Sequence, residues 1–324
     1  MIFAAGYRVA GTKSGRLSSQ KLMGAFAGNV QNVSDHMRRL FIPRPGFRFV
    51  QNDLEGAEAV VVALLVTDGN FRELVRRKIK IHNFVCLKMF PDKFTEFFTS
   101  QEIKELSPRS LHEHPAYKKI VAHCKSLKTE YDLAKRTVHG SNYSMGWKTM
   151  QESILKGTSG RVVLPAAECK RLLTSYFDLF PEVKVFQTTF DKHAQEFTEF
   201  SNLFGWKIRC VQRYTTAVGR TCISWGPQST VGVATIIAGQ RFQAHIERLS
   251  RNWNLLNCVH DSLLAEAPAD EVLEAAAVLA DCMTFTFTSP IDGWTCTIGV
   301  EKSVGDNWSK WDAVENPNGM KVIA

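Results

Sequence analysis

The stretch that most constrains this fold is FRFVQNDLEGAEAVVVALLV, residues 47–66. Residues 47–52 alternate as the two faces of a β-strand do, and Asp53 follows where that strand ends. Residues 55–66 predict a helix, with no Pro and only Gly56 against it. A carboxylate between a buried strand and a helix is held rigidly, as a metal ligand must be. Asp is also a preferred helix cap, so simple capping stays open as the alternative role of Asp53.

The second informative stretch is LLNCVHDSLLAEAP, residues 255–268. It predicts a hairpin with strands at residues 255–259 and 262–266 and a turn at His260 and Asp261. An Asp at a hairpin tip is often only a turn residue. Two Asp residues at two strand ends can also share one site. Paired Mg²⁺ ions need such hard oxygen ligands and keep their remaining positions for phosphate and water.

The third informative stretch is LAKRTVHGSNYSMGW, residues 133–147. Lys135, His139 and Tyr143 recur every four residues, so on a helix they share one face and span roughly 12 Å. That face offers an ammonium group for phosphates at one end and aromatic planes for a base and a sugar at the other. The alternative is a helix whose Lys is solvated and whose His and Tyr pack inward.

The charge and composition narrow the class of partner. The net charge is +8 with a pI near 9.1, which suits a polyanion. The Gly- and Ser-rich residues 11–19, with Arg16, precede an amide pair at Gln31 and Asn32. Such groups suit phosphate and base-edge contacts, although a solvated polar loop has the same composition. Eight Cys without a C-x-x-C pair argue against a zinc site and for a reducing compartment.

The rest of the chain predicts mostly helices. We expect them at residues 166–179, 183–200, 227–249 and 271–287, with strands within 205–221 around a turn near Gly219 and a last strand at 294–300. The polar tail, residues 307–324, is expected to be loosely held, with Trp308 and Trp311 docking it. No apolar run is long enough for a signal sequence or a membrane span.

Taken in order, these stretches resemble the motifs of family A DNA polymerases, most closely those of phages. FVQNDLEGAEAVVVALL resembles the first catalytic motif, AKRTVHGSNYSMG the fingers motif and CVHDSLLAEAP the third motif. In the family's order, GTKSGRLSS, VQN and RRLFIPRPG precede these motifs, and IH and PQSTVG fall between them. The resemblance runs from about residue 8 to residue 300. It implies a template-directed DNA polymerase located in the cytoplasm, that of the host if a phage encodes it.

The resemblance also implies a fold of the α+β class, with an antiparallel-sheet palm and a helical fingers subdomain. Residues 1–58 and 228–324 would form the palm, and residues 59–227 the fingers and connecting helices. The family's thumb and exonuclease domain would precede Gly11, where only ten residues stand. We therefore expect a fragment, or one part of a split enzyme whose thumb comes from a second polypeptide.

Individual roles follow from the same resemblance. Asp53 and Asp261, with the Leu54 carbonyl, would bind two Mg²⁺ ions, with Mn²⁺ as an alternative, and Lys135 would join the two Asp residues in catalysis. The residues implied to bind the deoxynucleoside triphosphate are Glu58, His82, Lys135, His139 and Tyr143. Those implied to contact primer–template DNA are Arg16, Gln31, Asn32, Arg220, Gln228 and His260. Glu58, helped by Tyr143, would exclude a ribose 2′-OH.

Three positions depart from the family pattern. Tyr131 stands where the family has an Arg, so one triphosphate contact is missing unless Arg136 or Lys128 supplies it. Lys80 replaces the Asp that usually precedes Ile-His. Ser262 replaces an acidic residue, as in the phage single-subunit RNA polymerases. An RNA-synthesising relative and a non-catalytic DNA-binding remnant therefore stay open as alternatives.

Overall fold

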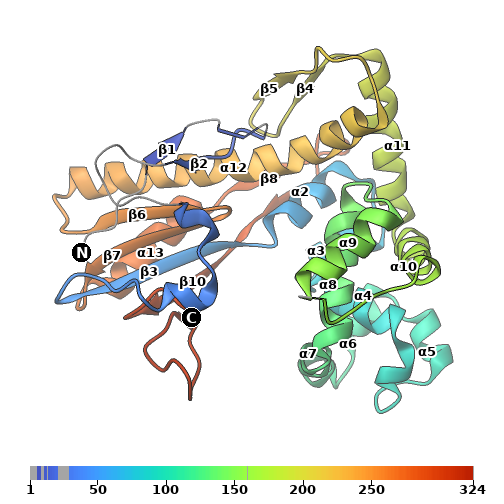
Figure 1. Cartoon of the computed structure of the whole chain (residues 1–324), viewed down its shortest axis with the longest axis horizontal. Helices are drawn as coiled ribbons and strands as arrows, with labels where there is room; N and C mark the ends of the chain where they lie inside the picture. Colours follow the sequence, from blue (N-terminus) through green and yellow to red (C-terminus); the bar gives the residue numbers. More distant parts are fainter. Residues whose placement is uncertain (1–5, 9–10, 13, 21–28, 159, 324) are drawn as a thin grey trace.

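The computed structural model describes residues 6–8, 11–12, 14–20, 29–158 and 160–323. These residues form two lobes, which Figure 1 shows side by side. One lobe is built on an antiparallel sheet and the other on helices from the middle of the chain. The long helix α12 (Thr216–Arg248) runs along the sheet and reaches towards the helical lobe.

The central sheet has five antiparallel strands, and β3 (Phe47–Glu55) lies in its middle. The strand order is β11 (Lys321–Ile323), β10 (Gly299–Gly305), β3, β7 (Ser262–Pro268) and β6 (Asn254–Val259). With the helical lobe beside it, this sheet confirms the predicted α+β class. The hairpin expected at residues 255–266 is also confirmed, as β6 and β7.

The alternation of side chains along β3 decides which face each residue occupies. Val50 and Leu54 are buried in a core shared with α12 and with α13 (Val272–Met283). Asn52 points the same way, and its Nδ2 donates to the Ala276 carbonyl at 2.9 Å. Asp53 is out of phase with these residues, so it lies on the opposite face of the sheet.

The helical lobe follows α2 (Ala57–Leu65), which continues directly from β3. Its helices are α3 (Asn70–Arg76), α4 (Ile81–Met89), α5 (Ser100–Glu105), α6 (Pro108–Glu113), α7 (Tyr117–Ser126), α8 (Lys128–Asn142), α9 (Trp147–Gly157), α10 (Ala166–Leu179) and α11 (Pro181–Glu196). Phe84, Tyr176 and Phe180 are among the side chains fully buried between them. The bounds predicted for α10 from its apolar spacing are confirmed.

Short elements complete the chain. Three two-stranded ribbons pair β1 (Gly6–Arg8) with β2 (Ser18–Gln20), β4 (Glu199–Ser201) with β5 (Lys207–Arg209), and β8 (Thr286–Thr288) with β9 (Thr295–Thr297). The remaining single turns are η1 (Val30–Asn32), α1 (Asp35–Arg38) and η2 (Pro91–Phe94). In the part of the chain that the structure describes, no helix is long and apolar enough to cross a membrane.

The prediction for residues 205–249 is wrong in one respect. A turn was expected at Gly219 and a new helix at Pro227, but α12 runs through both residues. Gly and Pro break an isolated helix. Here both residues are buried and flanked by packed neighbours, and this tertiary packing outweighs local propensity.

The tail was expected to be loosely held, and this is also wrong. Strand β11 pairs with the edge of the sheet, and Trp308 is 2% exposed. The Trp308 Nε1 donates to the Gln51 Oε1 at 2.8 Å, and its backbone N donates to the Phe41 carbonyl at 3.1 Å. The expected docking by Trp308 is thus seen. The predicted domain borders fall in α2 and inside α12 and stay predictions.

Candidate active site

Asp53 and Asp261 come together near one end of the sheet: Asp53 lies within β3, which runs on to Glu55 rather than ending at residue 52 as expected, and Asp261 lies in the turn just before β7. Asp53 lies directly opposite Ser262 in the pairing of β3 with β7, and Asp261 is the residue just before Ser262. The Leu54 backbone N donates to the Asp261 carbonyl at 3.1 Å, which closes the pairing at this end. His260, the other turn residue, has a φ of 57°, in the left-handed region that non-glycine residues rarely adopt. The turn thus fixes where Asp261 stands relative to Asp53.

Nearby positive charges compensate these two carboxyl groups only in part. Burial, and then the charge of Asp261, raise the pKa of Asp53 above its ordinary value. Burial raises the pKa of Asp261, and a hydrogen bond from its own backbone opposes this increase. The negative charge of Glu58 raises the pKa of Asp261 further. Two half-buried carboxylates that repel each other are a donor set suited to a divalent cation. Among the described residues, no three His, Cys, Asp or Glu side chains form a complete metal site, so oxygens of other kinds would have to complete it.

Glu58 links three parts of the chain at this site. Its carboxylate accepts a hydrogen bond from the Arg16 guanidinium and another from the Tyr143 hydroxyl. Its Oε2 also lies 4.0 Å from the His139 Nδ1. Burial first, and then the charge of Glu58, raise the pKa of Tyr143. The hydroxyl therefore stays protonated and donates a hydrogen bond to Glu58. The helix α2, the N-terminal residues 14–20 that contain Arg16, and the end of α8 therefore meet at the Glu58 carboxylate.

The predicted face of α8 is present. Lys135 and His139 are exposed on it, and the His139 side chain is 69% exposed. Tyr143 caps the helix, with its ring edge-on to His139 at 5.6 Å. His139 and Tyr143 both approach Glu58, and the Tyr143 ring also packs against the helical core. Lys135 and His139 are thus exposed while Tyr143 is partly packed inward, and the ligand-binding role of this face stays a prediction.

His82 lies on the neighbouring helix α4. Its Nε2 is 2.7 Å from the Tyr131 hydroxyl, and the two rings meet edge-on at 4.9 Å. Burial, reinforced by the positive charge of Lys135, lowers the pKa of His82 from 6.5 to about 4. The ring is therefore neutral at physiological pH. Since α4 and α8 pack together, His82 and Lys135 occupy one region of the helical lobe.

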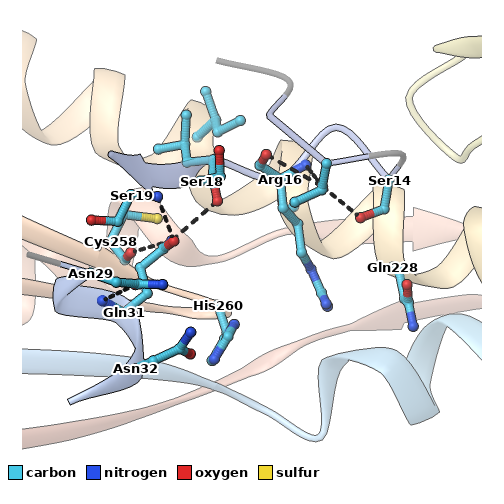
Figure 2. Close-up of a pocket in the computed structure, with 14 residues that line it drawn as sticks. Ser14, Arg16, Ser18, Ser19, Asn29, Gln31, Asn32, Gln228, Cys258 and His260 are labelled. Carbon is cyan, nitrogen blue, oxygen red and sulfur yellow. Dashed lines mark hydrogen bonds between the residues drawn. The ribbon is translucent and has the colours of Figure 1, made fainter. Parts of the chain in front are cut away.

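A pocket of about 400 Å³ lies between the N-terminal segment, α12 and the hairpin turn. In Figure 2, Arg16, Gln228 and His260 reach in the same direction from these three elements. Asn32 also lines this pocket. Gly232 allows α12 to approach closely, because a Cβ there would be 2.8 Å from the Cγ of Arg16. Five of the six residues predicted to contact DNA thus line one pocket.

Two of the six predicted residues, Gln31 and Arg220, differ from the others in their partners or position. Gln31 lines the pocket, but its amide is used to hold the fold (Figure 2). It donates to the Leu17 carbonyl at 3.2 Å and the Cys258 carbonyl at 3.0 Å, and accepts from the Ser19 N at 2.9 Å. Arg220 lies outside the pocket, exposed on α12 and about 12 Å before Gln228 along the helix axis. Their predicted roles stay predictions.

Two charged residues near the pair were missed from the sequence. Glu301 lies opposite Asp53 in β10, and its charge contributes to raising the pKa of Asp53. The positive charge of Lys310, in the docked tail, lowers the pKa of Asp53. Both depend on pairings that are distant along the chain, and no local pattern signals them.

Comparisons with known proteins agree with this architecture. The model of DNA polymerase family A matches residues 110–310. A DNA polymerase I of Chloroflexus aurantiacus is 23% identical over 94% of this chain and 28% of its own length. The Aquifex aeolicus DNA polymerase I is 21% identical over 92% of this chain and 47% of its own. The Arabidopsis thaliana DNA polymerase I A, chloroplastic/mitochondrial, is 21% identical over 92% of this chain and 28% of its own.

The fold itself also has a solved counterpart. The POL domain of Pol1 from M. smegmatis, in a complex with DNA primer-template and dNTP, superposes with a TM-score of 0.68. It is 17% identical, and the match covers 94% of this chain and 48% of that one. The chain spans about a quarter to a half of the length of the relatives it matches. Since the family match covers more than half of the 324 residues, the chain belongs to DNA polymerase family A.

Proposed function

We propose that the chain catalyses template-directed addition of deoxynucleotides to a primer 3′-OH. The observation that carries this proposal is the meeting of Asp53 and Asp261, near which Glu58 accepts a hydrogen bond from Tyr143 at the end of α8. Family membership supports it, and so does the solved relative, which was captured with DNA primer-template and dNTP.

Each group at the site has a definable task. Asp53, Asp261 and the Leu54 carbonyl would hold two Mg²⁺ ions, or Mn²⁺. When bound, such ions lower the pKa of the primer 3′-OH and stabilise the charge of an in-line displacement. Lys135 would neutralise charge on the triphosphate. His139 would offer a ring face to the incoming base, since its side chain is exposed beside Tyr143.

Sugar selection would depend on the position of Glu58. Its carboxylate is held by Arg16 and Tyr143, so it cannot swing away from a ligand that lies on the α8 face. A ribose 2′-OH would crowd this fixed pair, whereas a deoxyribose would not. We infer a preference for deoxynucleotides, which argues against the RNA-synthesising alternative.

The pocket around Arg16 would receive the end of the primer–template duplex. Arg16, Gln228 and His260 present hydrogen-bonding groups from three rigid elements. Minor-groove acceptors are similar in all base pairs, so such groups check the shape of a pair without reading its sequence. The net charge of +8 favours this polyanion. A second polypeptide supplying a thumb, and a cytoplasmic location, stay predictions.

The test is primer extension with a synthetic primer–template, Mg²⁺ and the four deoxynucleotides. Asp53→Ala and Asp261→Ala should each abolish extension while circular dichroism shows a folded chain. Asp281→Ala, on the exposed surface of α13, is the matched control and should extend normally. Normal extension by either active-site variant would refute the proposal. Salt-sensitive DNA binding without any extension would favour a non-catalytic remnant.

A further inference from the structure

Three lysines surround His82, and each belongs to a different helix. Lys80 is the N-cap residue of α4, Lys125 lies in the last turn of α7, and Lys135 lies on α8. Two contacts bring these helices together. The Cys124 Sγ is 3.7 Å from the Asn83 carbonyl, which sets α7 beside the first turn of α4, and Tyr131 contacts His82 from α8.

These lysines carry charge that the described residues do not neutralise. All three are exposed, and within the described part of the chain none has a carboxylate within 4.0 Å. The nearest acids along the chain are already paired, Glu130 with Lys93 at 3.7 Å and Asp132 with Arg136 at 2.9 Å. Like charges gathered in this way repel one another, so their convergence favours an anionic ligand.

The same contacts decide what can replace the arginine expected at position 131. Arg136 is not available, because it bonds to Asp132 and reaches the Ser153 carbonyl at 3.4 Å, against α9. Lys80 stands two residues before His82, and Lys125 follows Cys124, which contacts the carbonyl of the residue after His82. The lysines that these contacts bring towards His82 are Lys80 and Lys125, together with Lys135 on the helix of Tyr131, and the charges of all three lower the pKa of His82.

We propose that Lys80 and Lys125 join Lys135 in binding the triphosphate of the incoming nucleotide, and that Tyr131 is a positioning residue that orients His82 towards the same group. This rests on the proposed function and names the residues that bind its substrate. Lysine suits this task because its ammonium is a compact charge on a flexible stem. The N-terminus of α4 adds free N–H groups and the positive end of its dipole.

Tyr131 restricts the His82 ring. Because the Tyr131 hydroxyl occupies Nε2, only Nδ1 of the neutral ring is left for a ligand. A ring held in one orientation loses less freedom when a phosphate binds. Removal of this hydroxyl should therefore weaken binding without removing any charge.

The experiment is calorimetric titration of the full chain with inorganic tripolyphosphate and with dATP. Lys80→Ala and Lys125→Ala should each weaken binding of both probes about tenfold, the loss of one charge-assisted contact. Lys80→Arg and Lys125→Arg should retain most of the affinity. Lys104→Ala, an exposed lysine on α5, is the matched control and should leave affinity unchanged. Tyr131→Phe should weaken binding a few-fold and change the ¹⁵N shifts of the His82 ring, a change that simple packing would not cause.

The two proposals fail in distinguishable ways. If Lys80→Ala and Lys125→Ala bind both probes like the wild-type chain while Lys135→Ala loses affinity, this inference is wrong and the proposed function survives. If Lys135→Ala also binds both probes like the wild-type chain, this inference and the role of Lys135 are wrong, whereas the proposed function fails only if Asp53→Ala or Asp261→Ala extends primers normally. If Tyr131→Phe leaves both the affinity and the His82 shifts unchanged, the positioning role is refuted.

Discussion

Replacing Asp53 with Asn should make the metal-free chain more stable at pH 8, at the expense of function. Burial and the charge of Asp261 raise the pKa of Asp53 from 3.8 to about 7. Between these two pH values the folded carboxyl group holds a proton that the unfolded chain has lost. The free energy of unfolding contributed by Asp53 is therefore highest below pH 4 and falls as the pH rises to 7.

The size of this effect follows from the same pKa values. A difference of about three pH units corresponds to about 4 kcal/mol as an upper bound, at about 1.36 kcal/mol for each unit. Relaxation and nearby water weaken buried electrostatics, so about 2 kcal/mol is a reasonable lower figure. Asn has nearly the same shape and no charge. Asp53→Asn should therefore raise the melting temperature by roughly 3–6 °C at pH 8, at about 1.5 °C per kcal/mol for a chain of 324 residues.

Thermal melts in EDTA across pH 4 to 8, followed by circular dichroism, provide the assay. The gain of Asp53→Asn should shrink towards zero near pH 4. Asp281→Asn, an exposed control, should melt like the wild-type chain at every pH. Added Mg²⁺ should stabilise the wild-type chain at pH 8 and narrow the gap. An Asp53→Asn variant no more stable than the wild type at pH 8, or a gain independent of pH, would refute the reasoning.

Three further predictions concern other parts of the site. Glu58→Ala should raise ribonucleotide incorporation relative to deoxynucleotide in steady-state assays, and Tyr143→Phe should raise it less, because it removes one of the two bonds that hold Glu58. Gly232→Ala should displace Arg16 and weaken primer–template binding several-fold in fluorescence anisotropy, with unchanged melting. Trp308→Ala should destabilise the chain by about 3–5 kcal/mol in thermal melts, since it leaves a cavity at a buried site. A loss below about 1 kcal/mol would instead support the original expectation that the tail is loosely held.

The sequence predicts those features of this fold that are local in character. The first strand, its following helix and the hairpin with Asp261 each carry their own periodicity and turn residues. The helix at residues 166–179 is amphipathic and follows Pro165, so its bounds can be predicted. Two strand ends that each carry an Asp also suffice to suggest a shared site.

Features that depend on distant partners could not be predicted in the same way. Gly219 and Pro227 signal breaks, and the packing of this part of α12 against α11, β4 and α2 overrides them. The tail lacks a strong strand pattern in its sequence. Strand β11 forms because it pairs with β10, and this pairing cannot be predicted from the tail alone. Likewise, the position of Glu301 beside Asp53 exists only once the sheet has formed. Their prediction requires the register of the folded sheet.

The most direct test of the central claim is titration with Mn²⁺, followed by electron paramagnetic resonance. If Asp53 and Asp261 hold the same ions, each single change to Asn should weaken Mn²⁺ binding at least about tenfold. The double variant should bind little worse than either single one, because the two residues act together. Asp281→Asn should bind normally. Wild-type affinity in either active-site variant, or fully additive losses in the double variant, would contradict a shared site.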